Sequence, residues 1–247
     1  MDKSKDFLLD LLFPKFCLGC KKEGTYLCDD CRGLLDISEF GYCLCEANGQ
    51  PKRLLEGHVG KCSICSRKEL AGLYFALSYK EKTLTRNLIY QFKYKPYLKD
   101  LAKTLASIIV EHLVISGKNT NDIWENSVLV PVPLDSKKIK DRGYNQSEEL
   151  AKELSVVLNV PVVLNVLVKI KQTDSQKGLS KTEREKNLQG AFAIKSCSTS
   201  DVEQLSGKKV FLVDDVYTTG STMTECAKTL KTGGAKQVWG ICLAREG

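Results

Sequence analysis

The sequence VFLVDDVYTTGSTM, residues 210–223, is the most informative stretch of this chain of 247 residues. It begins with uncharged, β-branched residues that are typical of a buried strand, and it then reaches the adjacent acids Asp214 and Asp215. A Thr-Thr-Gly-Ser loop follows, and a helix is expected from about Ser221 until it ends at Gly233. The pattern predicts an acidic pair at a strand end, just before a polar loop that opens a helix.

This arrangement suits a phosphorylated sugar. Ligands of open α/β sheets bind beyond the carboxyl ends of the strands, and the free N–H groups at a helix start attract anions. Gly220 lets the backbone approach a phosphate closely, and paired carboxylates can hold ribose hydroxyls directly or through a metal ion. The competing interpretation is structural, an N-capped helix after an acid-tipped strand. We predict a phosphoribose site made of Asp214, Asp215, Val216, Tyr217, Thr218, Thr219, Gly220, Ser221 and Thr222.

Strand and helix patterns alternate over the rest of the chain from residue 71. Strands are expected at 73–79, 127–134, within 160–168, at 209–215 and at 236–244, and further helices at 101–115 and 145–158. The polar stretch 196–206 is expected to be a surface loop. This alternation predicts an α/β fold with a mostly parallel sheet that is flanked by helices on both faces.

The first 70 residues form a different region, which we predict to be a separate Cys-rich module before a domain at 71–247. Eight of the eleven cysteines lie here, as two CxxC pairs, one CxC pair and a further CxxC pair: Cys17, Cys20, Cys28, Cys31, Cys43, Cys45, Cys62 and Cys65. Four thiolates at such spacing can surround one tetrahedral Zn²⁺, so one or two structural zinc ions are expected. The remaining cysteines, Cys197, Cys226 and Cys242, are expected to be small buried residues.

The second set of cysteines leaves alternatives open. Its CxC pair departs from the usual CxxC spacing, and His58 could replace one ligand. Interleaved pairing, in which each zinc takes one pair from each set, is a further option. Reduced core cysteines would be the structural alternative, but a segment this short has little core to place eight of them in.

The net charge of +7 comes entirely from beyond residue 70, because the first 70 residues contain equal numbers of acidic and basic side chains. The excess gathers at 80–95, 137–142 and 169–186, which suits a nucleic acid or a pyrophosphate as well as an ordinary solvated surface. Within 90–97, aromatic residues alternate with lysines, a mixture that can stack unpaired bases or simply pack a helix. No apolar run reaches the length of a membrane span, and the N-terminus is interpreted as an amphipathic helix, so a cytoplasmic location is expected.

Several of these segments resemble known proteins. Residues 210–223 resemble the phosphoribosyl pyrophosphate signature of type I phosphoribosyltransferases. The segments 93–102, 128–151 and 169–192 resemble the ComF family of competence proteins, which includes ComFC. The resemblance covers nearly the whole chain, the cysteine-rich region included. It implies a type I phosphoribosyltransferase-like domain behind an N-terminal zinc ribbon.

The resemblance also implies a role and partners. It implies that the protein binds phosphoribosyl pyrophosphate with Mg²⁺ and helps single-stranded DNA enter the cytoplasm, beside a competence helicase and peripheral to the inner face of the membrane. By the same resemblance, residues 169–187 would form a mobile hood over the substrate. Because pyrophosphate departure needs positive charge, Arg142, Lys171 and Arg184 are the catalytic candidates beside the acidic pair. In the family, arginine is commoner where Lys169 and Lys171 stand, which weakens the assignment of Lys171 because lysine lacks a bidentate fork.

Three functional hypotheses share the site at Asp214–Thr222. The first is ligand binding in the service of competence, the second is an ordinary phosphoribosyltransferase that acts on an unidentified base or amine, and the third is a regulator that senses the ligand. They differ in whether an acceptor pocket exists, whether DNA binds and whether pyrophosphate is released. No residue in the sequence identifies an acceptor.

Overall fold

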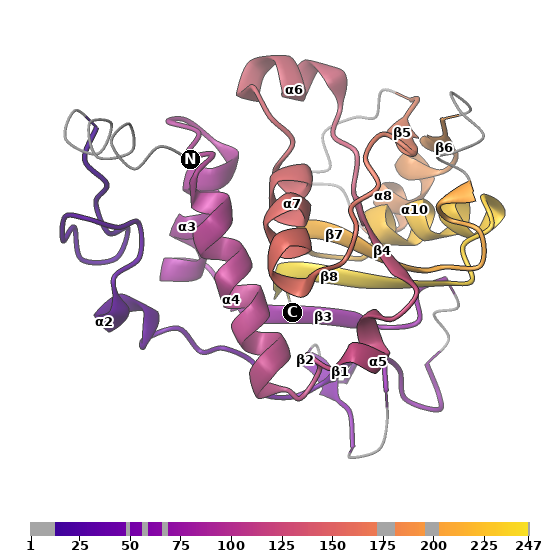
Figure 1. Ribbon diagram of the computed structural model, residues 1–247, viewed down its shortest axis with the longest axis horizontal. Coiled ribbons are helices and arrows are strands. Elements are labelled where there is room, and N and C mark those ends of the chain that lie inside the picture. The colour runs from indigo at the N-terminus through magenta and orange to yellow at the C-terminus, as the bar shows by residue number, and fades with distance from the viewer. Residues whose placement is uncertain are drawn as a thin grey trace.

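The computed structural model describes residues 13–47, 50–55, 59–65, 69–171, 181–195 and 203–246. Its main element is a six-stranded mixed sheet with the strand order β2-β1-β3-β8-β7-β4 (Figure 1). Four neighbouring strands are parallel: β3 (Leu73–Tyr79), β8 (Gln237–Glu246), β7 (Lys209–Tyr217) and β4 (Ser127–Pro131). The predicted α/β fold with a mostly parallel sheet is confirmed.

The two remaining strands of the sheet come from the cysteine-rich region. β1 (Tyr42–Ala47) runs antiparallel to β3 and pairs with β2 (Gln50–Arg53), which forms the edge of the sheet. The sheet therefore runs across the boundary that the sequence predicted between residues 70 and 71. That this region folds as a module of its own stays a prediction.

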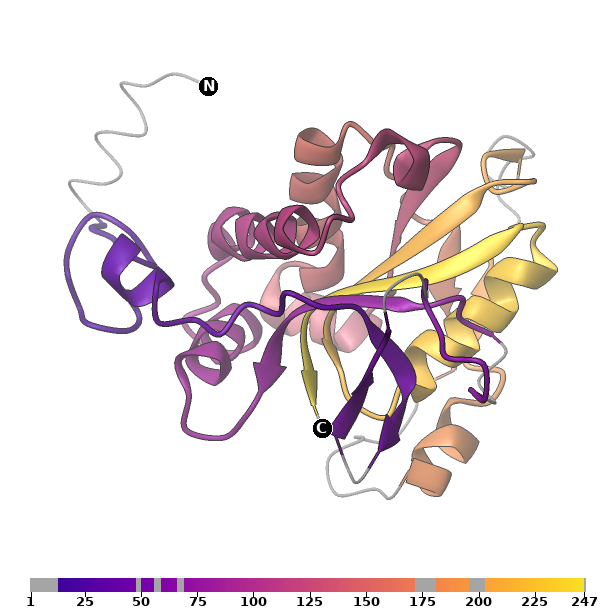
Figure 2. The ribbon, with the colours of Figure 1, turned by 90° about the horizontal axis from the view of Figure 1, so that it is seen from below.

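Helices cover both faces of the sheet, which Figure 2 shows from below. On one face lie α3 (Leu84–Lys93), α4 (Leu101–Ile115) and α7 (Gln146–Leu158), and on the other lies α10 (Ser221–Thr232). The pleat of β7 explains how one strand serves both faces, because successive side chains of a strand point in opposite directions. Phe211 packs into the first core and Leu212 into the second, and both are fully buried.

The shorter elements complete the chain. They are α2 (Asp29–Arg32), α5 (Asn121–Trp124), α6 (Ser136–Arg142), α8 (Lys181–Leu188), β5 (Leu167–Lys169) and β6 (Phe192–Ile194). β5 and β6 pair antiparallel as a small separate sheet, which packs with α8 against α10. The short basic helix α6 follows β4 and stands at the top of Figure 1, above the start of α7.

The predicted strands and helices differ from the observed ones mainly at their ends. The strand expected at 127–134 ends at Pro131, while β7 continues two residues beyond the acidic pair. The strand expected within 160–168 is reduced to Leu167–Lys169, because Val162 joins the main sheet only through an isolated bridge to Leu129. The expected opening helix and most of the polar loop at 196–206 lie outside the described residues. Among the described helices, none is long and apolar enough to cross a membrane.

Candidate functional site

The acidic pair lies near the carboxyl end of β7, a central strand of the parallel part of the sheet. Oδ1 of Asp214 accepts hydrogen bonds from the Ser147 hydroxyl and from the backbone N–H of Asp215, each at 2.9 Å. Burial, and then the charge of Asp215, raise the pKa of Asp214 to about 7. Asp215 is buried and Asp214 is partly buried, and adjacent carboxylates with little access to water are costly unless cations neutralise them, so this end of β7 is suited to receive positive charge.

Within the described residues, Lys93 is the cation that forms an ion pair with the acidic pair. Its Nζ lies 2.9 Å from Oδ1 of Asp215, and only 25% of its side chain is exposed. Burial would lower the pKa of Lys93, but the charges of Asp215 and Asp214 outweigh burial and raise it. The ammonium neutralises one carboxylate, which leaves the charge of the other for a metal ion or for sugar hydroxyls.

The loop after β7 turns tightly into α10. Gly220 precedes the helix with a φ of 79°, in the left-handed region that favours glycine. Space also excludes a side chain there, because a Cβ at Gly220 would lie 2.2 Å from the hydroxyl of the buried Tyr217. The hydroxyls of Thr219 and Ser221 lie 2.8 Å apart across the turn. This conformation brings the first N–H groups of a twelve-residue helix next to the acidic pair, where they can bind an anion.

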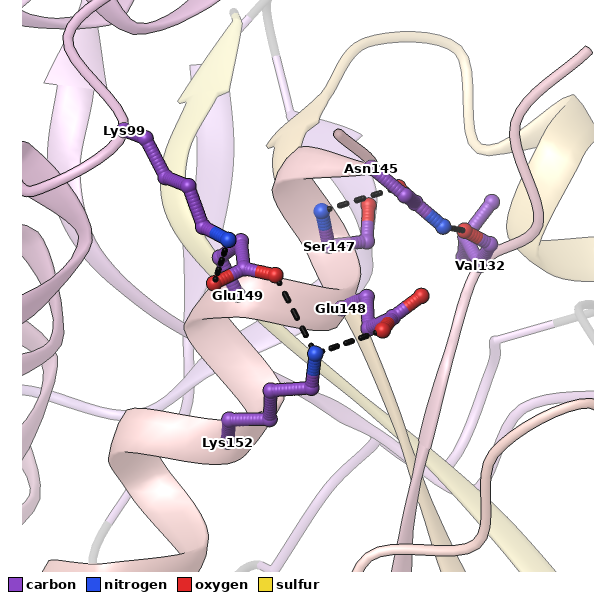
Figure 3. A network of polar contacts seen from close by, with 7 residues as sticks. All are labelled: Lys99, Val132, Asn145, Ser147, Glu148, Glu149 and Lys152. Carbon is purple, nitrogen blue, oxygen red and sulfur yellow. Dashed lines mark hydrogen bonds and ion pairs between the residues drawn. The ribbon is translucent and has the colours of Figure 1, made fainter. Parts of the chain in front are cut away.

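Residues at the start of α7, the helix that follows β4 and α6 in the chain, support the acidic pair. Asn145 caps the helix by accepting a hydrogen bond from the N–H of Ser147, and its own amide donates to the carbonyl of Val132 at 3.0 Å (Figure 3). Both side chains are buried, so the loop after β4 is tied to the helix turn that presents the Ser147 hydroxyl to Asp214. Figure 3 also shows a chain of ion pairs that joins Lys99, from the loop before α4, to three residues of α7: Glu149, Lys152 and Glu148.

The three cations predicted to assist pyrophosphate departure are placed differently from Lys93. Arg142 ends α6 and is half-buried, and its Nη1 has no hydrogen-bond partner among the described residues. Lys171 is exposed just after β5. Arg184 lies within α8, but its side chain is outside the described residues. Neither Arg142 nor Lys171 contacts the acidic pair, so their catalytic roles stay predictions.

The stretch predicted to be a hood is described only in part, because residues 172–180 lie outside the described residues. Its first strand reaches toward α6, since burial and then the charge of Lys138 lower the pKa of Lys169. The strand that follows it, β6, packs on the far end of α10, where Ile194 lies against Gly233. Closure of this stretch over a substrate stays a prediction.

The first cysteine cluster consists of Cys17, Cys20, Cys28 and Cys31, whose sulfurs all lie within 4.8 Å of one another. Sulfurs that surround a zinc ion at about 2.3 Å stand about 3.8 Å apart, and the observed distance from Cys20 to Cys28 is 3.5 Å. Burial would raise the pKa of Cys17, but backbone hydrogen bonds, the largest from Cys28, lower it to about 6 and favour the thiolate. The cluster fits a four-thiolate zinc site.

The second cysteine cluster consists of Cys43, Cys45, Cys62 and Cys65. The first three sulfurs lie 3.3 to 3.6 Å apart, and the N–H of Cys62 donates to the sulfur of Cys43 at 3.2 Å. The thiol of Cys65 hydrogen-bonds to Cys43 but is not within 4.8 Å of all three. The structure therefore groups the cysteines in sequence order and not interleaved, and His58 lies outside the described residues. This cluster also fits a metal site, with the fourth ligand less tightly placed.

Comparison with known proteins places the chain in a family. Residues 96–247 match the family model described as the phosphoribosyl transferase domain. The chain is 31% identical over 235 residues to "Competence protein F" of Haemophilus influenzae, an alignment that covers 89% of this chain and 98% of that protein. The chain belongs to the ComF family.

Other ComF relatives agree with this assignment. The "DNA utilization protein YhgH" of Salmonella typhi is 28% identical over 231 residues, covering 87% of this chain and 96% of the relative. "Competence protein ComFC" of Streptococcus pneumoniae is 29% identical over 146 residues, covering 59% of this chain and 56% of the relative. A solved hypoxanthine phosphoribosyltransferase from Staphylococcus aureus aligns with 67% of this chain and 73% of its own at 12% identity and a TM-score of 0.35, too slight a likeness to bear on the argument. The family match confirms the predicted type I phosphoribosyltransferase fold behind a cysteine-rich N-terminal region.

Arg245 connects the second cysteine cluster of this ComF protein to the loop between β7 and α10. It is 1% exposed, and its guanidinium donates to the carbonyls of Cys43, at 2.6 Å, and Leu44, at 3.4 Å. The same guanidinium lies 5.5 Å from the ring centre of Tyr217, whose hydroxyl occupies the space beneath Gly220. One buried side chain thus contacts both the cysteine-bearing strand β1 and the support of the loop.

Sequence reasoning missed Lys93, Ser147 and Arg245. Lys93 and Ser147 gave no signal of their own, because each meets the acidic pair only through the packing of a separate helix. Arg245 gave a weak signal: it is a charged residue directly after the apolar stretch VWGICLA, at the end of the last strand, and a buried charge needs partners. That signal indicates a buried ion site but does not identify the carbonyls that satisfy it.

Proposed function

We propose that this ComF protein binds phosphoribosyl pyrophosphate together with Mg²⁺ at residues Asp214–Thr222. One observation carries the proposal: an acidic pair, of which Asp215 is buried and Asp214 partly buried, is only partly neutralised by Lys93 and adjoins a glycine-opened helix start. The first feature attracts a cation and hydroxyl donors, and the second attracts a phosphate. A ribose 5-phosphate that is bound together with a metal ion presents the cation, the hydroxyls and the phosphate close to one another, and few other ligands do.

Each part of the site has a role in this proposal. Asp214 and Asp215 hold the ribose hydroxyls and the magnesium ion, while the turn from Thr218 to Thr222 holds the 5′-phosphate. Bound Mg²⁺ would supply neutralisation of the pyrophosphate charge. Ser147 orients Asp214 through its hydroxyl, and Lys93 is positioned to exchange Asp215 for a pyrophosphate oxygen once the metal binds.

The biological half of the proposal is a role in natural competence. Relatives that align over nearly their whole length are named for competence and for DNA utilisation. We infer that this chain handles single-stranded DNA as it enters the cytoplasm, with a competence helicase as partner. The two cysteine clusters would each hold a structural Zn²⁺, because four protein thiolates leave no open position for chemistry.

A second candidate function is transfer of the ribosyl group to a base or an amine. It is favoured by the pKa of Asp214, which burial and Asp215 raise to about 7, since an acid or base is most useful near the working pH. Release of pyrophosphate from the ligand in the presence of an acceptor mixture would support this candidate. A protein that only senses the ligand would bind it and release none.

Titration calorimetry with phosphoribosyl pyrophosphate and Mg²⁺ tests the site. The Asp214→Asn, Asp215→Asn double variant should lose binding while its thermal unfolding remains cooperative, because amides keep the shape and lose the charge. The matched control is Asp29→Asn with Asp30→Asn, an exposed adjacent acid pair in α2 that carries the same charge change. Equal affinity of the wild type and the Asp214, Asp215 variant would remove the assignment.

The pH dependence of binding is a second test of the same site. Because the pKa of Asp214 is raised to about 7, the carboxyl is largely protonated below that pH and cannot hold a cation. Affinity should therefore fall about fivefold as the pH drops from 7 to 6, because the ionised fraction of Asp214 falls from about one half to about one eleventh. Part of any decline belongs to protonation of the ligand itself, so the comparison is with Asp214→Asn, whose weaker binding should vary less with pH. Parallel curves would contradict a role for Asp214 ionisation.

A further inference from the structure

The outward face of α3 and its C-cap residue carry a stripe of three large side chains, Arg86, Tyr90 and the capping Tyr94, spaced four residues apart. That spacing places them on one side of the helix. The two tyrosines are 48% and 52% exposed, and their ring centres lie 4.9 Å apart at an interplanar angle of 35°. Phe92 from the same aromatic run is fully buried in the core. Helix packing therefore explains Phe92 and leaves the tyrosine pair exposed at the surface.

The stripe lies in a strongly positive segment. Residues 80–99 contain six lysines and arginines against a single glutamate. Lys93 and Lys99 pair with Asp215 and Glu149, but no ion pair among the described residues engages Arg86 or Lys95. Both of these are exposed. Their charges are therefore available to a polyanion that lies along the helix.

This chemistry selects the partner. Half-exposed aromatic faces among cations suit a single-stranded nucleic acid, whose bases stack on the rings while the cations meet its phosphates. A duplex keeps the faces of its bases inside the helix, where Tyr90 and Tyr94 cannot reach them. Self-association through the stripe would bring two positive faces together, which is unfavourable.

We propose that Arg86, Tyr90 and Tyr94 form a stacking platform for single-stranded DNA. The proposal rests on the proposed function in DNA handling, and it identifies the surface where the DNA would bind. The platform adjoins the phosphoribose site, because α3 ends at Lys93, which holds Asp215. It also adjoins the first cysteine cluster, because Asn87 of the same helix donates to the carbonyl of Leu18 at 2.8 Å.

The experiment is fluorescence anisotropy with a short labelled oligothymidylate and full-length, zinc-loaded protein. Tyr90→Ala with Tyr94→Ala should weaken binding on the order of tenfold, since stacking is the interaction removed. Tyr90→Phe with Tyr94→Phe keeps both rings and should bind like the wild type. The matched control is Phe40→Ala with Arg53→Gln beside β2, which removes a partly exposed aromatic–cation pair elsewhere and should not change the affinity.

Salt dependence separates stacking from charge. Arg86→Gln should reduce the slope of log K against log salt by about 0.7, because one phosphate contact is lost. The tyrosine-to-alanine pair should leave that slope unchanged. An oligonucleotide of abasic sites should bind the wild type and the Tyr90→Ala, Tyr94→Ala double variant (the alanine pair) equally, because it has no bases to stack. A slope that changes with the tyrosines but not with Arg86 would overturn the assignment of roles.

Two further outcomes would overturn the platform. Equal affinity of the alanine pair and the wild type for oligothymidylate would mean that the DNA lies elsewhere. A changed sedimentation coefficient of the alanine pair without loss of DNA affinity would identify the tyrosines as a self-association surface. Phosphoribosyl pyrophosphate binding is measured on the same preparations, so a wild type that binds this ligand but no DNA would instead refute the DNA half of the proposed function.

Discussion

The two cysteine clusters of this protein are attached to the rest of the chain in different ways. The first lies outside the sheet and packs against the helices: Cys17, Cys28 and Cys31 belong to the same buried core as α3 and α4. Arg32 of α2 also binds Glu111 of α4 at 2.6 Å, and Asn87 of α3 donates to the carbonyl of Leu18. The second is built into the main sheet, because Cys43 and Cys45 belong to β1. Figure 1 shows the first cluster's segment in indigo at the left, beyond α3 and α4.

Similar cysteine motifs can therefore differ in how much of the fold depends on them. Loss of a metal from an appended cluster should unfold little beyond that cluster. Loss of a metal from a cluster inside the sheet should reach the loop between β7 and α10, because Arg245 contacts both the carbonyl of Cys43 and the ring of Tyr217. The predictions below test this contrast, beginning with the largest expected effect.

The largest effect is expected when each cluster loses one ligand pair in turn. Cys62→Ser with Cys65→Ser should destabilise the main unfolding transition by at least about 4 kcal/mol, in the range seen when a structural metal is lost. Cys17→Ser with Cys20→Ser should destabilise that transition clearly less, because the first cluster packs against α3 and α4 but contributes no strand to the sheet. Calorimetric unfolding and elemental analysis of zinc check both variants, and each should lose one equivalent of zinc.

The same pair of variants also reports on the ligand site. Affinity for phosphoribosyl pyrophosphate should fall only in the Cys62, Cys65 variant. If both variants unfold the sheet equally, the first cluster is not an appendage and the contrast is wrong. If purified protein contains no zinc at all, neither cluster is a zinc site.

The next effect concerns the residue that joins the second cluster to the loop. Arg245→Met should cost about 3 kcal/mol in the free energy of unfolding, because the carbonyls of Cys43 and Leu44 lose a buried charged donor. Urea unfolding checks the cost. Combination with Cys62→Ser and Cys65→Ser should give less than the sum of the separate losses, since the arginine and the cluster stabilise the same strand. Strict additivity would mean that they act independently.

The parts of the molecule that the sequence predicted well are those with a complete local pattern. The apolar periodicity of 73–79 and 101–115 gave β3 and α4 with their observed bounds, because every position of those patterns belongs to one element. The turn from Asp214 to Thr222 was predicted for the same reason. Its acids, glycine and helix start are adjacent in the chain, so their geometry depends on few distant residues.

The parts that escaped prediction depend on contacts between distant segments. Lys93 reaches Asp215 only because α3 packs against β3, two strands away from β7 in the same sheet, and no spacing within the sequence indicates that packing. The pairing of β1 with β3 is likewise non-local, and its cysteines suggested a module apart from the sheet. Cys226 and Cys242 were predicted to be buried and are fully buried, because isolated cysteines in apolar segments need no partner to explain them.

A smaller effect is expected at the loop end of the Arg245 contact. Gly220→Ala should cost about 2 kcal/mol, because alanine pays for a left-handed φ and its Cβ would clash with the Tyr217 hydroxyl. Tyr217→Phe removes the oxygen but keeps the ring carbons Cζ and Cε2, which would lie 2.5 and 2.8 Å from that Cβ, so the double variant should recover only a small part of the steric loss. Thermal unfolding of the three variants and the wild type checks this. A Gly220→Ala variant of unchanged stability would show that the turn is not constrained as described.

The smallest effect is expected where the first cluster meets α4. Arg32 donates to Glu111 through two nitrogens, at 2.9 and 2.6 Å, and to the Ser107 hydroxyl at 3.0 Å. About a third of each charged side chain is exposed, so solvent screens the pair and Arg32→Ala should cost about 1 kcal/mol or less. A double-mutant cycle with Glu111→Gln isolates the pairwise part, and the exposed pair of Lys228 with Glu225 is the matched control.

Hydrogen exchange gives the decisive contrast. Exchange in residues 17–31 should quicken in Arg32→Ala while the amides of β7 and β8 keep their protection, because an appended cluster can detach without opening the sheet. Faster exchange in the strands would instead mean that the first cluster stabilises the sheet as the second one does.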